Sequence, residues 1–217
     1  MIPTPDLSHL TRRDYESVYE PAEDTFILLD ALEQDADELR NMQPSISLEI
    51  GSGSGCVSSF IGTILGPSNT LYLATDINER AASCTARTGR QNNIPIEPII
   101  ANLVAPLRSR LRHAVDILVF NPPYVPTFES EAEDAQTTRN IQGAWAGGAN
   151  GMQVTDLLLE QVDDLLSSQG RFYLVAVKQN DVPAIQERMR QRFNLRSDVV
   201  LQRRAGREHL LILRFQR

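Results

Sequence analysis

An amide, two prolines and an aromatic ring stand together directly after the mostly apolar segment 116–120, in the order Asn121-Pro122-Pro123-Tyr124. The nitrogen lone pair of an amide or exocyclic amine is delocalised, so a site that methylates such a nitrogen must first hold its N–H groups. Asn121 offers the Oδ1 acceptor, Pro122 offers a carbonyl whose own nitrogen carries no donor, and Tyr124 offers a flat face. The motif predicts methylation of a planar nitrogen; a strand that ends in a proline-rich turn is the alternative.

Three glycines at alternate positions follow a second apolar segment, in Leu48-Glu49-Ile50-Gly51-Ser52-Gly53-Ser54-Gly55. Glycines permit a tight turn and a close approach of ligand to backbone, and the first N–H groups of the next helix face the same crevice. Glu49 would place a carboxylate under a cofactor. The spacing differs from the dinucleotide fingerprint, and no P-loop lysine follows, so a pyrophosphate ligand is disfavoured. The loop predicts a nucleotide-type cofactor site, with a flexible strand-to-helix turn as the alternative.

An acid ends a further apolar segment, 71–75, and stands 25 positions after Gly51. In a βαβ unit, an acid at the end of the second strand accepts hydrogen bonds from ribose hydroxyls. We therefore predict that Asp76 binds a ribose. Its other role would be the N-cap of the following helix, which Asn78 could take instead.

Strand and helix patterns alternate from residue 46 to the end of the chain. This alternation predicts a parallel sheet with helices on both faces. The last two strands lie so close that they must form a hairpin, which predicts one antiparallel strand at the sheet edge. The predicted strands are 45–50, 71–75, 96–100, 115–120, 172–177, 198–202 and 209–215; the predicted helices are 53–65, 78–91, 152–167 and 183–193, with a leading helix within 20–40.

The predicted fold class is therefore α/β, with a seven-stranded, mostly parallel sheet. The carboxyl ends of its early strands converge on one crevice, where such sheets bind ligands. Gly51, Asp76, Asn102 and Asn121 all fall at this edge.

Length and composition predict one catalytic domain over 1–217, in which 1–44 form an N-terminal helical extension. The chain has 217 residues and 41% hydrophobic content, enough for a substantial core. We expect no membrane span and no secretory signal, and hence a cytoplasmic location, with the nucleus as a second one. Cys56 and Cys84 have no metal-ligand spacing, so no metal site is expected. The net charge of −7 argues against unaided binding of nucleic acid.

A long segment, 125–152, interrupts the alternation of strands and helices. It begins with the acidic run 129–134, which we expect to be a mobile loop, and continues with the sole tryptophan, Trp145, beside a pair of glycines. Trp145 could form a wall of the substrate pocket or serve as a structural anchor.

These motifs, in this order, resemble those of the class I S-adenosylmethionine-dependent methyltransferases. More narrowly, they resemble the eukaryotic and archaeal branch of the HemK-like family, which methylates the glutamine side chain of peptide-chain release factors. The Asn-Pro-Pro-Tyr motif is shared with methyltransferases of nucleic-acid amines. The narrower resemblance rests on Tyr19-Glu20-Pro21-Ala22-Glu23-Asp24-Thr25 and on Ala144-Trp145-Ala146-Gly147-Gly148.

The resemblance implies S-adenosyl-L-methionine as cofactor, a Rossmann-like fold, Leu103 beside the adenine and Asn121 near the methyl group. Asn102 stands where the family commonly has an acid, so its amide oxygen would contact the adenine amine. The predicted cofactor-binding residues are Thr25, Glu49, Gly51, Gly53, Gly55, Asp76, Ile77, Asn102, Leu103 and Asn121. The predicted catalytic residues are Asn121, Pro122 and Tyr124, and the predicted substrate-binding residues are Asn121, Pro122, Pro123, Tyr124 and Trp145.

The resemblance also implies two protein partners. One is a release factor, methylated at glutamine N5 in its Gly-Gly-Gln motif, and the other is a small zinc-binding activator that forms a heterodimer with the catalytic chain. Apolar candidates for the activator's docking surface are the strand 96–100 and the neighbouring segment 71–73, with packing in the core as the alternative role for most of these side chains. Two other functions stay open: methylation of adenine N6 or guanine N2 in nucleic acids, and a cofactor-binding scaffold without activity.

Overall fold

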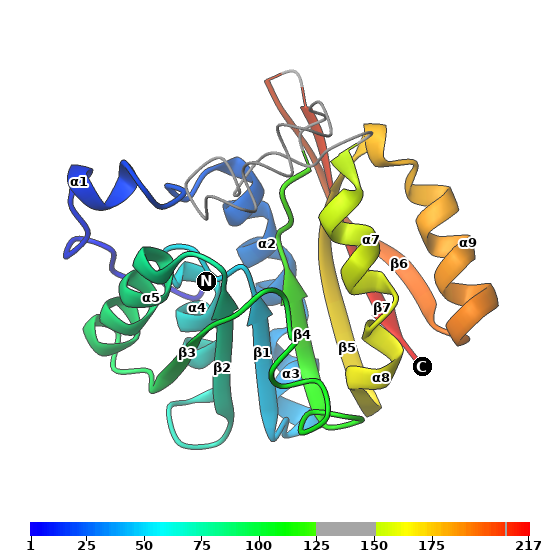
Figure 1. Ribbon diagram of the computed structural model, residues 1–217, viewed down its shortest axis with the longest axis horizontal. Coiled ribbons are helices and arrows are strands. Elements are labelled where there is room, and N and C mark those ends of the chain that lie inside the picture. The colour runs from blue at the N-terminus through cyan, green and yellow to red at the C-terminus, as the bar shows by residue number, and fades with distance from the viewer. Residues whose placement is uncertain (125–150, 207) are drawn as a thin grey trace.

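A seven-stranded sheet with helices on both faces forms the body of the molecule in the computed structural model (Figure 1). The structure describes residues 1–124, 151–206 and 208–217. The predicted fold class is confirmed. The predictions for the acidic run 129–134 and for Trp145 lie outside the described residues.

The strands lie in the order β3-β2-β1-β4-β5-β7-β6. The first five in this order pair in parallel, whereas β7 is antiparallel to both of its neighbours. The predicted hairpin is present, with the reversed strand β7 second from the edge and β6 outermost. Four of the nine β7 residues are buried but none of β6 is, so the more apolar strand takes the inner place. The bounds are β1 Ile46–Ile50, β2 Leu71–Asp76, β3 Ile96–Ile100, β4 Val115–Phe120, β5 Leu166–Val177, β6 Arg196–Ala205 and β7 Glu208–Gln216.

Two apolar cores lie on opposite faces of the sheet. Successive side chains of a strand point to opposite faces, and β4 shows this directly, since Ile117 and Val119 join one core and Leu118 and Phe120 the other. All six β4 residues are buried, as expected for a central parallel strand covered on both sides.

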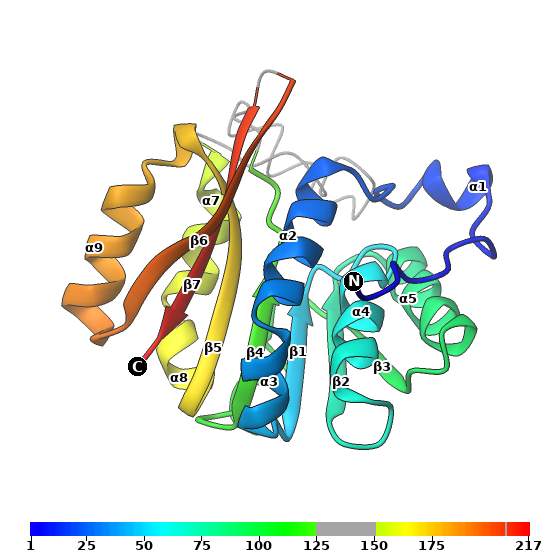
Figure 2. The same ribbon diagram turned by 180° about the vertical axis from the view of Figure 1, so that it is seen from behind.

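The helices divide between the two faces. In the described ranges, α2, α3 and α4 supply the first core and α7, α8 and α9 the second (Figures 1 and 2). None of the helices in these ranges has the length and apolar character needed to cross a membrane. The bounds are α1 Arg12–Tyr15, α2 Glu23–Gln34, α3 Ala36–Met42, α4 Cys56–Leu65, α5 Glu79–Gln91, α7 Gln153–Leu159, α8 Val162–Leu165, a short 3-10 helix Lys178–Asn180 and α9 Val182–Phe193.

The leading helix predicted within 20–40 is two helices, α2 and α3, separated at Asp35. The Asp35 carboxylate is buried, and it accepts hydrogen bonds from Tyr173 Oη at 2.6 Å and Arg214 Nη1 at 2.8 Å. The break therefore coincides with a polar contact that joins the N-terminal helices to β5 and β7.

The helix predicted over 152–167 was too long, and the strand predicted at 172–177 too short. The helical segments α7 and α8 end at Leu165, and β5 begins at Leu166, which pairs with Val115 of β4. Ser167 Oγ donates to Asp116 Oδ1 at 2.6 Å and fastens this first part of β5. Pairing with β4 overrides the helical spacing of the leucines, which is why the local sequence pattern gave the wrong boundary.

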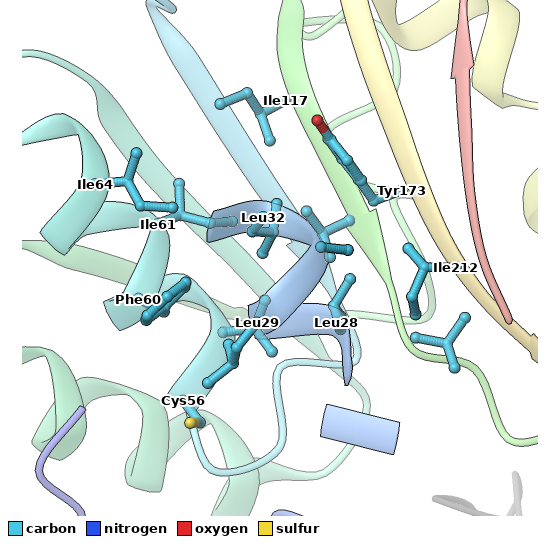
Figure 3. Close-up of a cluster of buried hydrophobic side chains, with 14 of the residues drawn as sticks. Leu28, Leu29, Leu32, Cys56, Phe60, Ile61, Ile64, Ile117, Tyr173 and Ile212 are labelled. Carbon is cyan, nitrogen blue, oxygen red and sulfur yellow. The ribbon is translucent and has the colours of Figure 1, made fainter. Parts of the chain in front are cut away.

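We expect Leu32→Ala to lower the free energy of unfolding by about 2–5 kcal/mol, because Leu32 of α2 is fully buried in the first core (Figure 3). The matched control is Leu157→Ala, since Leu157 of α7 is 58% exposed and the same change there should stay within about 0.5 kcal/mol of wild type. Chemical denaturation measures both. Equal effects would contradict the placement of Leu32 in the core.

Candidate active site

A cavity lies at the carboxyl ends of β1, β2 and β4, at the edge where the sequence predicts a ligand crevice. Ten predicted site residues line it: Thr25, Glu49, Gly51, Gly53, Asp76, Ile77, Asn102, Leu103, Asn121 and Pro123. Gly55, Pro122 and Tyr124 are not in the lining, and Trp145 lies outside the described residues. The structure thus brings most of the set together around one cavity, and their roles stay predictions.

The glycine loop between β1 and α4 passes through three left-handed residues, with φ of +66° at Gly51, +52° at Gly53 and +78° at Gly55. This backbone region favours glycine, and it is why α4 begins at Cys56 and not at the predicted residue 53. A Cβ on Gly55 would lie 2.7 Å from the Thr85 Cα of α5, so Gly55 permits the close packing of the loop on that helix.

Asp76, the predicted ribose ligand, ends β2 and faces the glycine loop. Its Oδ2 accepts from the Gly53 backbone N–H and its Oδ1 from that of Asn78, both at 2.9 Å. Burial raises the pKa of Asp76, and these backbone donors oppose the rise. Asn78 caps α5 by accepting from the Arg80 N–H, so the predicted alternative cap is confirmed and the Asp76 carboxylate stays at the cavity.

Glu49 lies under the glycine loop with 4% of its surface exposed. Its Oε2 accepts from the Ser58 backbone N–H at 2.9 Å and from the Ser58 hydroxyl. Burial raises the pKa of Glu49 to about 8, although both Ser58 donors act in the opposite direction. In the ligand-free protein the Glu49 carboxyl therefore keeps its proton to a higher pH than a glutamate in water does.

Two residues after β3 also line the cavity. Asn102 is exposed, and Leu103 adopts a left-handed backbone with φ of +49°. A non-glycine residue in this region is strained, and such residues gather at ligand sites. No residue pattern in this segment predicts the conformation.

Asn121, at the end of β4, contacts the N-terminal turn of α2. Its Nδ2 donates to Asp24 Oδ2 at 2.9 Å, and this contact leaves Oδ1 on the other side of the amide group. Asn121 Oδ1 is buried and accepts no hydrogen bond from the described residues. An unpaired buried acceptor is costly, and an N–H donor from outside the described residues would satisfy it.

Tyr124 is not among the residues that line the cavity. The residue is 9% exposed, and its hydroxyl donates to Glu208 Oε2 of β7 at 3.3 Å. Burial, with the nearby charges of Asp24 and Glu208, raises the pKa of Tyr124, which keeps the hydroxyl a neutral donor. A flat face offered to the substrate by this ring stays a prediction.

Sequence reasoning missed Asp24 and Tyr19, both of which line the cavity. The available signal was their place in the segment 19–25, directly before Thr25. An acid in the first turn of a helix is ordinary, since it interacts favourably with the N-terminal backbone groups, and this common role concealed the contact with Asn121.

Comparison with known proteins gives matches along the whole chain. The protein named methyltransferase HEMK2 from Mus musculus is 47% identical over 216 residues, covering 100% of this chain and 97% of its own. The HEMK2 of Homo sapiens is 48% identical over 212 residues, covering 98% and 95%. The eRF1 methyltransferase catalytic subunit mtq2 of Schizosaccharomyces pombe is 44% identical over 227 residues, covering 100% and 96%. No protein-family model matches the chain.

Among solved structures, the E. cuniculi Mtq2-Trm112 complex, described as responsible for methylating the eRF1 translation termination factor, aligns with a TM-score of 0.66 and 23% identity. The alignment covers 92% of this chain and 98% of the solved one. A T. thermophilus 16S rRNA methyltransferase in complex with AdoMet and guanosine aligns with a TM-score of 0.61 and 13% identity, covering 92% and 44%. At these identities the structures bear out the fold.

We expect the unfolding free energy of the ligand-free protein to contain a pH-dependent contribution that Glu49→Gln removes. Folding raises the Glu49 pKa from 4.5 to about 8, so the folded state keeps a proton that the unfolded chain loses first. The contribution is fully present below pH 4.5 and is lost as the pH rises toward 8.

Chemical denaturation at about pH 5 and about pH 8 measures this contribution. Glu49→Gln should gain stability relative to wild type at the higher pH. Glu23→Gln, at an exposed position of α2, is the control and should follow wild type. The same pH dependence in wild type and Glu49→Gln would contradict the raised pKa.

Proposed function

The chain belongs to the HemK-like methyltransferase family that includes HEMK2 and mtq2, and from this membership we propose its substrate and its methyl donor. It methylates N5 of the glutamine side chain in the Gly-Gly-Gln motif of a peptide-chain release factor. S-adenosyl-L-methionine is the methyl donor. The chain is a methyltransferase by its family. The substrate proposal is supported by the full-length match to a protein named for eRF1 methylation.

The residues around the cavity fit the proposed cofactor. Asp76 offers a carboxylate for ribose hydroxyls, and Ile77 and Leu103 offer apolar surface for an adenine. Gly53 leaves open space beside the loop, since a Cβ there would meet nothing within 4 Å. When bound, S-adenosylmethionine supplies an electrophilic methyl group that a nitrogen can take in a single displacement.

The unpaired Oδ1 of Asn121 is the observation that carries the proposal. A glutamine amide has two N–H groups, and its nitrogen is a weak nucleophile because its lone pair is delocalised. Asn121 Oδ1 and the Pro122 carbonyl would accept these two N–H groups and hold the nitrogen so that its lone pair can face the methyl. The proton lost from nitrogen leaves after transfer, so a strong base is not required.

We expect the chain, co-expressed with a small zinc-binding activator, to transfer labelled methyl from S-adenosylmethionine to release factor, and to lose this transfer when the Gly-Gly-Gln glutamine is replaced by alanine. Asn121→Ala should abolish turnover while cofactor binding survives in weakened form. Asp76→Ala should instead raise the dissociation constant for the cofactor, because it removes the proposed ribose acceptor.

Filter assays and calorimetry measure transfer and cofactor binding. Label on DNA or RNA, with none on release factor, would overturn the substrate and favour a nucleic-acid amine. A near-normal rate in Asn121→Ala would remove that residue from the mechanism.

We also propose that a small zinc-binding activator covers the β3 edge of the sheet. The S. pombe relative is named a catalytic subunit, and the E. cuniculi neighbour is a complex with Trm112. Leu71 of β2 is 47% exposed and Ile100 of β3 is 55% exposed. A terminal strand with large apolar side chains and an unpaired outer backbone is suited to a protein partner.

We expect Leu71→Asp and Ile100→Asp each to reduce co-purification of the activator with this chain, because each places a charge in the proposed apolar contact. Leu157→Asp is the control, since Leu157 is 58% exposed but belongs to α7, which lies on the other side of β4 from β3 (Figure 1). Equal recovery of the activator with all three variants would place its docking surface elsewhere. The isolated chain should be poorly soluble or inactive, and full turnover without a partner would contradict the heterodimer.

A further inference from the structure

We propose that Asp24 is a positioning residue for the methyl transfer, whose carboxylate orients the Asn121 amide so that Oδ1 is presented to the substrate nitrogen. The inference rests on the proposed function, because that function gives Asn121 Oδ1 the task of holding a substrate N–H group. Asp24 acts through Asn121, and no contact with the reacting atoms is assigned to it.

The two carboxylate oxygens of Asp24 have different partners. Oδ2 accepts from Asn121 Nδ2 at 2.9 Å, and Oδ1 accepts from the Tyr19 hydroxyl at 3.2 Å and from the Thr25 backbone N–H at 2.8 Å. Asp24 is 4% exposed. With Oδ1 engaged by Tyr19 and Thr25, Oδ2 is held in place for the Asn121 amide.

An ionised carboxylate accepts hydrogen bonds and cannot donate them. The amide atom of Asn121 that faces Asp24 must therefore be Nδ2, since the reverse orientation would bring Oδ1 against a negatively charged oxygen. A neutral amide at position 24 would accept either orientation of Asn121, because it has both a donor and an acceptor. The charge of Asp24, and not its shape alone, decides which atom of Asn121 faces the substrate.

The described partners of Asp24 are uncharged, so its charge is stabilised in another way. Asp24 is the second residue of α2, where the free backbone N–H groups and the helix dipole favour an anion. The helix start, the Tyr19 hydroxyl and the Thr25 N–H thus supply favourable partners for this buried carboxylate, and none of its described partners is a cation that would compete with Asn121.

An oriented Asn121 Oδ1 favours substrates that can donate an N–H hydrogen bond to it. A planar nitrogen with N–H groups satisfies this buried acceptor, whereas a flipped Asn121 would present two donors to the same nitrogen and repel it. The orientation of one amide thus contributes to the choice of acceptor group and to the alignment of its lone pair.

Asp24→Asn tests the inference in the complex with the activator. We expect kcat to fall by about 100-fold, as for other small misplacements of reacting groups, while the dissociation constant for S-adenosylmethionine stays near wild type. Glu23→Gln is the matched control, because it removes the same charge from the same helical turn at an exposed side chain. It should keep the wild-type kcat.

The exchanged pair Asp24→Asn with Asn121→Asp separates positioning from structural support. In this variant the amide at 24 can donate to the carboxylate at 121, which still presents an acceptor oxygen to the substrate. We expect it to recover part of the kcat lost in Asp24→Asn. If Asp24 only supported the structure, the exchanged pair would not recover kcat.

The Asn121 side-chain amide in the wild-type protein gives a readout that is independent of activity. We expect its Nδ2 protons to exchange slowly with solvent and to shift in the NMR spectrum of Asp24→Asn but not of Glu23→Gln. Rapid exchange in the wild type, or a wild-type kcat in Asp24→Asn, would overturn the inference. Absence of methyl transfer by the wild-type complex would instead overturn the proposed function, and the NMR result would still decide the orientation of Asn121.

Discussion

Burial of β4 on both faces is the constraint on which the rest of the structure depends. Its side chains alternate between the two cores, so neither face can turn toward solvent without exposing apolar surface. The backbone of β4 leaves the core only where the carboxyl ends of the strands meet. Phe120 is its last residue, so Asn121 lies beside the ends of β1 and β2. Apolar packing thus sets where the polar side chains of the cavity stand relative to the glycine loop.

The polar part of the cavity is acidic. Asp24, Glu49 and Asp76 all line it, and no lysine, arginine or histidine belongs to the described lining. Their contacts are mainly with backbone N–H groups and hydroxyls, and burial raises the pKa of both Glu49 and Asp76. Such a cavity is poorly suited to a pyrophosphate and well suited to a ligand with positive charge, as the proposed sulfonium cofactor has.

Local patterns allowed most of the fold and much of the lining to be predicted from the sequence. The ends of the parallel strands converge by topology, so identifying Glu49, Asp76 and Asn121 at strand ends was enough to bring them together. Tertiary contacts could not be predicted in this way. Asp24 and Asn121 are 97 positions apart, and Leu166 continues a helical spacing that only its pairing with Val115 overrides.

The turn 121–124 is anchored at both of its ends by distant parts of the chain. Asn121 is held by Asp24 of α2, and Tyr124 is held by Glu208 at the start of β7. The two intervening prolines restrict φ further. A turn fixed in this way has little conformational freedom left to lose when a substrate binds, so more of the binding interaction can serve alignment of the substrate nitrogen. The Tyr124 hydroxyl then contributes by anchoring the turn. This role is separate from the predicted one, in which the flat face of the ring contacts the substrate.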